Sequence, residues 1–440
     1  MRPTRRAISC QAGGGRATGA VIACAVGLLL VTAGCRRDPV EVAPVVAARP
    51  VRVLLFDTRE GLRVRTDGPA RVSDANNQPS DTRPLGTPQV DTPQLDTAPL
   101  GTRHLDWTTL TPQSLRINGR PVIPPVLIEP VRDGSLLVSR IESGRFESVR
   151  QYRGGLEIQE TDDGGLRVIN EVDVESYVAG VVACEVVSHF QQTTLEAQAI
   201  AARGYVLFAM SRAAQRDYDV RASEGDQVYR GIAHSAIGRR SRQAVNRTRG
   251  LVLAEATPRG PRIFPTYYAS ACGGHTQSVG AVQPGPVPEP LAGGVACDYC
   301  RIAPRNVYRW GPRELSGKML LKRLAQRYKT ARKWRSIASV SVTAREPGGH
   351  ITQVLVTGDN GDKLVLGGER FRLAVGSRVM RSTNCTLKFD GRSILLTDGK
   401  GFGHGLGMCQ WGAEGQARQG RTAGQILAFY YPGSRLVRAY

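Results

Sequence analysis

The sequence predicts an α+β fold, in which β-rich regions flank a pair of helices. Residues 51–172 and 336–396 contain short runs in which apolar and polar residues alternate, as they do in half-buried strands. Between these regions, residues 173–214 carry apolar residues and alanines at helical spacing, interrupted once by the polar stretch SHFQQ. We therefore expect a helical hairpin at residues 173–214, with β-rich structure on either side of it.

The first 35 residues are typical of an export signal. Several arginines precede the apolar run AVIACAVGLLLVTAG, and the run ends in small residues followed by a cysteine. We expect residues 1–35 to be a lipoprotein signal, with Cys35 as the lipidated residue. The alternative is an uncleaved single-pass anchor. Both interpretations predict a protein that is held at the membrane through its N-terminus and lies outside the cytoplasm, in the cell envelope or periplasm.

The chain is strongly basic, with 59 lysines and arginines against 38 acidic residues and a formal net charge of +21. Such a balance favours a polyanionic partner, which can be nucleic acid, an acidic membrane or an acidic wall polymer. The sequence has no zinc-finger spacing and no aromatic-rich RNA-binding stretch, so we do not expect nucleic acid. The arginines are scattered, which predicts a generally basic surface.

The N-terminal part is predicted to consist mainly of strands. After a linker at residues 36–50, the stretches VRVLLF and LRVRT alternate in the manner of strands. Residues 81–105 then repeat a five-residue unit, DTRPL GTPQV DTPQL DTAPL GTRHL. Its prolines exclude a regular helix or a central strand. We expect this repeat to be an exposed and disordered insertion within the β-rich region.

Glu185 is the most unusual residue of the predicted hairpin. Asp173 is placed to cap the first helix, in which Tyr177 and Glu185 share one face. Glu185 lies in the apolar run VVACEVV, where loss of hydration would raise its pKa and suit it to general acid catalysis near neutral pH. The alternative is a glutamate on the wet face of an amphipathic helix. Thr193 and Glu196 have the spacing of a capping box for the second helix.

Further helices are predicted downstream of the hairpin. Residues 232–247 and 318–329 have helical patterns, and a capping box formed by Thr422 and Gln425 predicts a last helix that Pro432 stops.

Four metal-ligand residues stand close together in the segment 264–304. Cys272-x-x-His275 followed by Cys297-x-x-Cys300 has the ligand types and the pair spacing of a structural zinc site. A disulfide is the alternative, which an exported protein permits, and free thiols are a third possibility. Four protein ligands would close the coordination sphere, so we do not expect a catalytic zinc.

Glycine recurs at every second position from Gly399 to Gly407, within the segment 399–436. This spacing strips one face of the chain of side chains, so that a long ligand or another backbone can lie against it. The segment is not a phosphate loop, because it lacks GK[ST] and the strand–GxGxxG–helix context. The alternative is a tight β-turn around the core histidine His404.

Five segments, taken in order, carry a resemblance to a known family. They are YVAGVVACE, EAQAIAARGYVL, DQVYRG, the ACGGHT element, and GHGLGMCQWGA with ILAFYYPG. Together they resemble the SpoIID/LytB family, which comprises the sporulation cell-wall lytic transglycosylase and the amidase-enhancer proteins. The resemblance covers roughly residues 51–436 outside the repeat, and it implies that residues 173–440 form the catalytic region of a peptidoglycan-binding or peptidoglycan-cleaving envelope protein.

The resemblance also implies roles for individual residues. The family's catalytic glutamate falls on Glu185, and its zinc-type position falls on Cys272 and His275. The closing motif matches at His404, Gly405, Gly407, Met408 and Gln410.

The sequence departs from the family pattern in two places, and both departures involve cysteine. The family usually has a small residue before the glutamate and Met-Pro after it, where this chain has Cys184, Val186 and Val187. The family usually has serine where this chain has Cys409. We hypothesise that Cys184 and Cys409 lie in contact and are linked, which requires Cα atoms within about 7 Å of each other.

A single carboxylic acid is sufficient for a lytic transglycosylase. The acid protonates the glycosidic oxygen and then takes a proton from the sugar's own 6-hydroxyl, whereas a hydrolase normally needs two carboxylates. The sequence offers Glu185, while Glu175, Glu224 and Asp226 remain open as acidic partners. We expect cleavage of glycan strands between muramyl and glucosaminyl sugars to anhydromuramyl products, and the resemblance suggests a preference for strands denuded of stem peptides.

The remaining predicted site residues would line a groove that the glycine-rich segment closes. They are Tyr177, Arg203, His404 and Gln410. The competing prediction is a non-enzymatic wall-binding protein that stimulates a cell-wall amidase and uses the same groove to bind glycan without cutting it. A third is a structural envelope lipoprotein.

Overall fold

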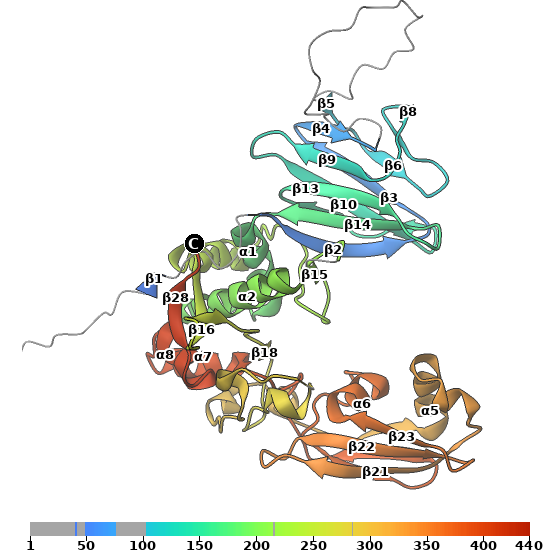
Figure 1. Cartoon of the computed structure of the whole chain (residues 1–440), viewed down its shortest axis with the longest axis vertical. Coiled ribbons are helices and arrows are strands. Elements are labelled where there is room, and N and C mark those ends of the chain that lie inside the picture. Colours follow the sequence, from blue (N-terminus) through green and yellow to red (C-terminus); the bar gives the residue numbers. More distant parts are fainter. Residues whose placement is uncertain (1–39, 42–48, 76–102, 214–215, 284) are drawn as a thin grey trace, which may run out of the picture. The chain divides into compact units, whose positions relative to one another are not determined.

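The computed structural model describes residues 40–41, 49–75, 103–213, 216–283 and 285–440 (Figure 1). The predicted signal with Cys35, most of the linker, and the repeat up to residue 102 lie outside these residues. Across the described ranges, no helix has both the length and the apolar character needed to cross a membrane. The α+β class is confirmed, since sheets dominate the early and late parts of the chain and a run of helices separates them.

The N-terminal region is built from two sheets. In the larger one the strands lie in the order β15 (Val220–Arg221), β2 (Val51–Thr58), β14 (Leu166–Val172), β13 (Gly155–Glu160), β9 (Val126–Pro130), β4 (Pro69–Ser73) and β5 (Arg103–His104). The smaller one has the order β11 (Arg145–Phe146), β10 (Ser135–Glu142), β3 (Leu62–Asp67) and β6 (Thr108–Leu110), and β12 (Arg150–Tyr152) also pairs with β10. A two-stranded ribbon consists of β7 (Arg116–Ile117) and β8 (Arg120–Pro121). Alternating burial along β3 agrees with the alternation in its sequence.

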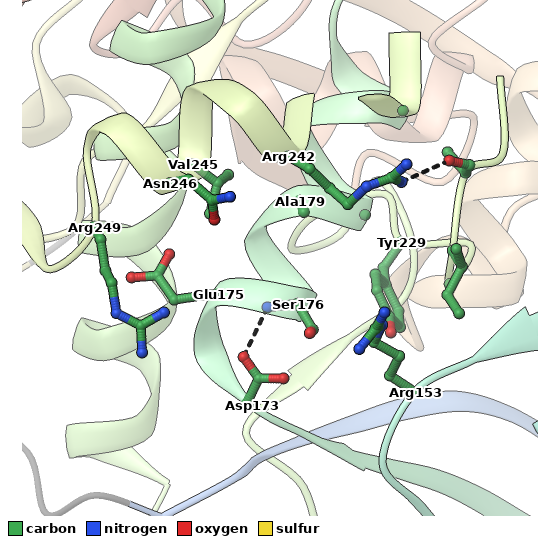
Figure 2. A pocket seen from close by; sticks show the side chains of 15 residues that line it. Arg153, Asp173, Glu175, Ser176, Ala179, Tyr229, Arg242, Val245, Asn246 and Arg249 are labelled. Carbon is green, nitrogen blue, oxygen red and sulfur yellow. Dashed lines mark hydrogen bonds between the residues drawn. The ribbon is translucent and has the colours of Figure 1, made fainter. Parts of the chain in front are cut away.

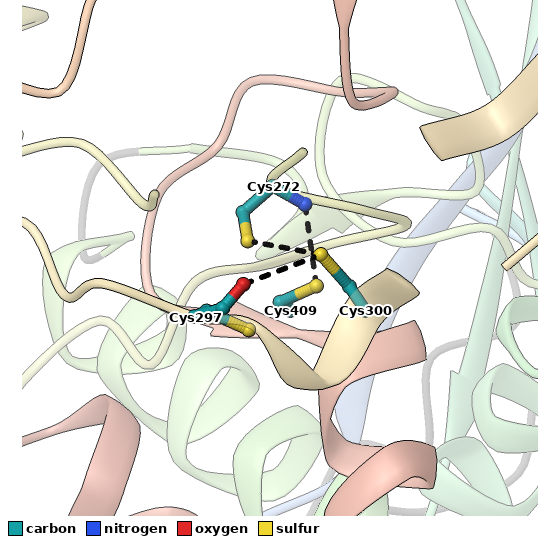
Figure 3. Close-up of side chains that lie close together, drawn as sticks. All are labelled: Cys272, Cys297, Cys300 and Cys409. Atoms are coloured by element: carbon teal, nitrogen blue, oxygen red, sulfur yellow. Dashed lines mark hydrogen bonds between the residues drawn. The ribbon is translucent and has the colours of Figure 1, made fainter. Parts of the chain in front are cut away.

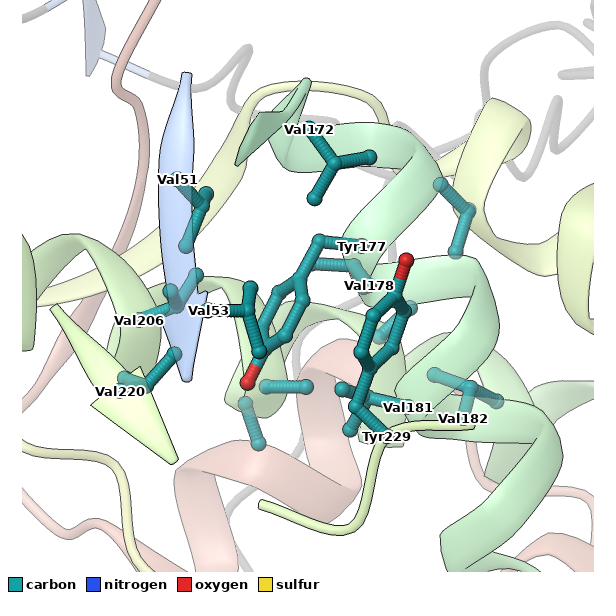
Figure 4. Packing of buried hydrophobic residues seen from close by; sticks show 14 of the residues in the cluster. Val51, Val53, Val172, Tyr177, Val178, Val181, Val182, Val206, Val220 and Tyr229 are labelled. Carbon is teal, nitrogen blue, oxygen red and sulfur yellow. The ribbon is translucent and has the colours of Figure 1, made fainter. Parts of the chain in front are cut away.

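Two consecutive helices follow the larger sheet, α1 (Val174–Glu185) and α2 (Gln192–Arg212). The predicted cap is confirmed, because the carboxylate of Asp173 accepts a 2.9 Å hydrogen bond from the amide of Ser176. Valines of α1 belong to the same hydrophobic core as Val51 and Val53 of β2, and the rings of Tyr177 and Tyr229 lie in this core with their centroids 5.0 Å apart (Figure 4). This packing fixes α1 on the sheet.

The start of α2 differs from the prediction. Its N-cap is Gln191, which makes no side-chain capping hydrogen bond, so the predicted capping box at Thr193 and Glu196 is wrong. Instead, the buried carboxylate of Glu414 accepts hydrogen bonds from the amide of Gln191 at 2.7 Å and from the hydroxyl of Thr194 at 2.8 Å. A residue from a distant helix therefore accepts the bond of the N-cap amide, which the glutamate of a local capping box would have accepted.

The chain then forms α3 (Ala236–Arg247), which Ser235 caps, and a four-stranded sheet. The strand order of this sheet is β1 (Val40–Glu41), β28 (Arg435–Arg438), β16 (Leu251–Glu255) and β17 (Arg262–Ile263). The C-terminal helices are α7 (Gln410–Arg418) and α8 (Ala423–Tyr430). The capping box of Thr422 and Gln425 at the start of α8 is confirmed.

A second hydrophobic core lies within residues 310–396 and is separate from the core around α1 and α2. Its helices are α5 (Gly317–Arg327) and α6 (Gly368–Val375). It has two sheets. One has the strand order β21 (Ile337–Arg345), β22 (Ile351–Gly358) and β23 (Lys363–Gly367), and the other has the order β20 (Arg313–Ser316), β25 (Ser393–Thr397) and β24 (Thr386–Phe389).

Short elements complete the fold: α4 (Arg305–Tyr308), β19 (Arg309–Trp310), β26 (Gly399–Lys400), β18 (Tyr268–Ala269), β27 (Met408–Cys409), and the 3-10 turns Val279–Ala281, Glu289–Leu291, Tyr299–Ile302 and Thr330–Lys333.

The glycine-rich segment lies against another stretch of backbone. β27 pairs with β18 in parallel, and isolated bridges join Ala271 to Phe402 and Gln277 to Leu406. Gly407 has φ of +63°, and a Cβ there would lie 2.0 Å from the carbonyl oxygen of Tyr267. Close chain packing thus explains this glycine. That the segment also closes a groove for a ligand stays a prediction.

Candidate active site and cysteine cluster

Glu185 is the last residue of α1 and its side chain is partly exposed. The amide of Val228 donates a 2.8 Å hydrogen bond to its Oε1. Burial raises the pKa of the Glu185 carboxyl, while the hydrogen bonds from Val228 and from the side chain of Gln410 pull the pKa down, with a net rise. A carboxyl that holds its proton more firmly than usual and still reaches solvent suits a general acid.

Gln410 connects the candidate acid to α2. It is the first residue of α7 and is nearly fully buried, and its Nε2 lies 3.3 Å from Oε1 of Gln198. Sequence reasoning did not single out Gln198. The available signal was a lone glutamine in the alanine-rich run LEAQAIAAR, because a polar residue on a buried helix needs a partner.

Tyr177 belongs to the core. Its side chain has no exposed surface, so the prediction that it lines a groove is corrected. Its hydroxyl donates to Oε1 of Gln227 at 3.1 Å, and Nε2 of Gln227 donates to the hydroxyl of Tyr268 at 2.9 Å. Burial raises the pKa of both tyrosines, and the charge of Glu185 adds to that rise. Gln227 and Tyr268 are therefore neighbours of the acid that the sequence analysis did not identify.

Arg203 is also a structural residue. Its side chain is fully buried, and Nη2 and Nε contact the two carboxylate oxygens of Glu175 at 2.6 and 3.2 Å. A further bond at 3.0 Å goes to the carbonyl of Leu251. Because its donors are engaged inside the protein, the predicted role of Arg203 in the groove is corrected.

His404 is tied to its own segment and to Tyr267. The amide of Leu406 donates to Nδ1 of His404 at 3.0 Å, which places the ring proton on Nε2. The ring of Tyr267 stands edge-on with its centroid 6.2 Å away. Burial lowers the pKa of His404 to about 4, so the imidazole is neutral at physiological pH. A neutral ring cannot act as a cation, and the backbone of Tyr268 is a further hydrogen-bond partner of this imidazole.

The possible acidic partners of Glu185 differ in whether their carboxylates are already bonded within the protein. Glu175 is paired with Arg203, and Asp226 accepts bonds from the hydroxyl of Tyr205 at 2.8 Å and from the amide of Arg221 at 2.9 Å. Glu224 is exposed, and its charge adds slightly to the raised pKa of Glu185. Glu224 is thus the acid to test as a second carboxylate.

Four buried cysteine thiols form a cluster (Figure 3). They belong to Cys272, Cys297, Cys300 and Cys409, and their sulfur atoms all lie within 4.8 Å of one another. The sulfur atoms of Cys272 and Cys300 are 3.6 Å apart, too far for a disulfide and close to the spacing of about 3.8 Å that tetrahedral zinc with Zn–S bonds of about 2.3 Å requires. The donor set therefore fits zinc.

The fourth member of the cluster differs from the prediction. His275 lies outside it and its Nδ1 contacts the carbonyl of Thr276 at 2.6 Å, whereas Cys409 completes the set. The amides of Cys272 and Gly412 approach the sulfur of Cys409 at 3.2 and 3.3 Å. Such amide bonds stabilise a thiolate. The hypothesis of a link between Cys184 and Cys409 is wrong, because both residues have free thiols.

A cavity of about 250 Å³ lies beside the first half of α1 (Figure 2). Its wall includes Arg153, Asp173, Arg242 and Asn246, and Arg242 donates a 3.0 Å hydrogen bond to the carbonyl of Ala233. Glu185 does not contribute to this wall. The cavity is therefore separate from the candidate acid.

Comparison with known proteins shows to which family the chain is related. A family model described as Stage II sporulation protein (SpoIID) matches residues 162–254, and a domain of unknown function (DUF8618) matches residues 301–407. An uncharacterized protein of Brachyspira hyodysenteriae is 34% identical over 271 residues, which cover 61% of this chain and 68% of that protein.

Two relatives from Bacillus subtilis carry more informative names. Stage II sporulation protein D is 25% identical over 284 residues, covering 62% of this chain and 76% of that protein. The amidase enhancer is 45% identical over 65 residues, covering 15% of this chain and 9% of that protein. With the segment that holds Glu185, Gln198 and Gln227 inside the SpoIID match, the chain belongs to the SpoIID/LytB family.

Proposed function

We propose that this protein is a lytic transglycosylase that cleaves peptidoglycan glycan strands, preferably strands denuded of stem peptides, to anhydromuramyl products. Membership of the SpoIID/LytB family supports a cell-wall function outside the cytoplasm. The observation that carries the proposal is Glu185, a partly exposed carboxyl whose pKa is raised by burial and whose carboxylate is met by the amide of Val228 at 2.8 Å.

The two halves of the reaction place opposite demands on Glu185. In the first, the protonated carboxyl donates its proton to the glycosidic oxygen, and burial favours this protonated form. In the second, the carboxylate accepts the proton of the sugar's 6-hydroxyl as that oxygen bonds to the anomeric carbon. The Val228 amide and Gln410 stabilise the carboxylate between the two steps. No water is consumed, so one carboxyl suffices.

The cysteine cluster is proposed to have a structural role. Cys272, Cys297, Cys300 and Cys409 would hold zinc through four thiolates, which leaves no position open for substrate. Cys409 is also the N-cap of α7, the helix that begins with Gln410. The cluster would therefore fix the helix that orients Glu185.

A second candidate function is a non-enzymatic wall-binding protein that stimulates a cell-wall amidase. The 45% identity to the amidase enhancer over 65 residues favours it, as do Cys184, Val186 and Val187 around the glutamate. In either case we propose attachment to the membrane through Cys35 or through an uncleaved anchor.

The product of glycan digestion separates these functions. Purified strands with and without stem peptides would be incubated with the chain lacking residues 1–35, and the products identified by mass spectrometry. Anhydromuramyl ends that disappear in Glu185→Gln and persist in Glu224→Gln support the transglycosylase. Ordinary reducing ends that require both glutamates indicate a hydrolase. Intact strands that co-sediment with the protein indicate the amidase enhancer.

A further inference from the structure

Four arginines surround one cavity at the edge of the second hydrophobic core. The cavity has a volume of about 310 Å³ and is lined by Arg305, Arg309, Arg313 and Arg381, together with Asn306 and Trp310. No carboxylate belongs to its wall. All of these residues fall within the segment that matches a domain of unknown function.

The four guanidinium groups are not neutralised by the protein. Among the described residues, none of the four arginines forms an ion pair with Asp or Glu. Four like charges gathered around one space raise the positive potential there, which favours the binding of an anion. This contrasts with Arg203, whose charge is matched by Glu175.

Two of the four arginines are held in place by neutral groups. Nη1 of Arg309 donates to the carbonyl of Gly273 at 2.8 Å, and its guanidinium stacks 3.9 Å from the ring centroid of Tyr308. Arg381 donates to the carbonyl of Asn306 and lies 5.6 Å from the ring centroid of Phe402. Carbonyls and rings orient these side chains without cancelling their charge, so they are arranged for an external anion before it arrives.

Trp310 supplies the apolar part of the wall. Its side chain is almost fully buried and packs against Gly399, the residue with which it pairs between β19 and β26.

We propose that this cavity binds an oxyanion, a carboxylate or a phosphate, carried by an anionic wall polymer. Guanidinium groups bind both through paired hydrogen bonds. The volume exceeds that of a single small ion, since a water takes about 30 Å³ of liquid, so the cavity has room for part of the molecule that carries the anion.

The wall of the cavity is connected along the chain to the candidate acid, and a role for the cavity in glycan cleavage rests on the proposed function. β19 pairs with β26 through Arg309–Lys400 and Trp310–Gly399, and the same strand leads through the glycine-rich segment to Gln410. One stretch of chain therefore joins the wall of the arginine cavity to the residue that hydrogen-bonds to Glu185.

Binding is tested in the Glu185→Gln background, so that the result is independent of glycan cleavage. Pyrophosphate and citrate would each be titrated calorimetrically into three proteins. The first is Glu185→Gln alone, the second also carries Arg305→Gln and Arg313→Gln, and the third instead carries Arg327→Gln and Arg335→Gln. Arg305 and Arg313 are exposed, and neither side chain makes a hydrogen bond or an ion pair with another described residue, so we expect the variant to fold. The second pair removes the same charge from exposed positions outside the cavity.

We expect at least one probe to bind, with affinity that falls as salt rises and drops about tenfold or more in the first pair and less than threefold in the second. Preference for pyrophosphate would identify a phosphate-bearing polymer, and preference for citrate a carboxylate-bearing one. The proposal is overturned if neither probe binds, or if both pairs weaken binding equally. Failure of glycan cleavage with intact anion binding would overturn only the proposed enzyme.

Discussion

The amide of Val228 donates a 2.8 Å hydrogen bond to Oε1 of Glu185, and this contact joins the end of α1 to a segment far along the chain. It stabilises the ionised carboxyl, while burial stabilises the protonated one. The side chain of Gln410 acts in the same direction as the amide. The pKa of Glu185 is therefore raised by burial and lowered by these hydrogen bonds, and the bond from Gln410 can be removed by substitution.

Gln410→Leu is expected to shift the pH profile of glycan cleavage towards higher pH. A general acid loses its activity as pH rises through its pKa, and loss of the Gln410 hydrogen bond leaves the effect of burial less opposed. The pH at which activity is lost on the alkaline side should therefore rise. Below that pH, the rate should fall by about ten- to a hundredfold, because a hydrogen bond to a charged group contributes roughly 1.5–3 kcal/mol. Anhydromuramyl product would be measured from pH 4 to pH 9.

The exposed Gln243→Leu on α3 is the matched control for this experiment and should leave the profile unchanged. If the alkaline limb of Gln410→Leu coincides with that of the unmodified protein, Gln410 does not tune Glu185.

Local signals in this sequence predicted two helix caps whose partners are near in the chain. Asp173 caps α1 through Ser176, and Thr422 and Gln425 form the capping box of α8. Each of these contacts spans three residues, so the spacing can predict it, whereas the same spacing at Thr193 and Glu196 forms no capping box because Glu414 takes over the start of α2.

Contacts between distant residues could not be predicted in the same way. Cys272, Cys297 and Cys300 were identified by pair spacing, but Cys409, which follows the segment 310–396 along the chain, takes the place predicted for His275. Arg203 was predicted to line the groove, and only the fold shows that it is buried with Glu175. Spacing reports neighbours along the chain, whereas these roles depend on neighbours in space.

Zinc content is expected to distinguish Cys409 from His275. The purified protein should contain about one zinc per chain, and Cys409→Ser should lose metal and unfold at a lower temperature. His275→Ala should retain it, because the imidazole lies outside the cluster. Cys385→Ser changes another buried cysteine and serves as the control. Elemental analysis and thermal unfolding would be measured together, and loss of zinc from His275→Ala alone would reverse the assignment.

Arg203→Met is expected to act on stability and not on substrate binding. The substitution leaves the carboxylate of Glu175 buried without its ion-pair partner, which costs about 3–5 kcal/mol. Adding Glu175→Gln removes the unpaired charge and should restore part of the loss. Denaturant unfolding of both single variants and the double variant gives the coupling between the two side chains. Weaker glycan binding by a fully folded Arg203→Met protein would instead place Arg203 in the groove.

Glu414→Gln is expected to destabilise α2 more than Glu196→Gln does. Glu414 is fully buried and accepts bonds from the amide of Gln191 at 2.7 Å, from Thr194 at 2.8 Å and from Nε of Arg418 at 2.7 Å. Loss of its charge should lower the free energy of unfolding by about 2–4 kcal/mol, since each bond to a charged group contributes about 1.5–3 kcal/mol.

Glu196 is the comparison because it is the residue that the sequence placed in the capping box of α2. In the structure it makes only a 3.2 Å ion pair with the exposed Arg247, so Glu196→Gln should cost less than about 1 kcal/mol. Denaturant unfolding of both variants decides between the distant cap and the local one. Equal losses, or a larger loss for Glu196→Gln, would show that the local capping box governs the start of α2.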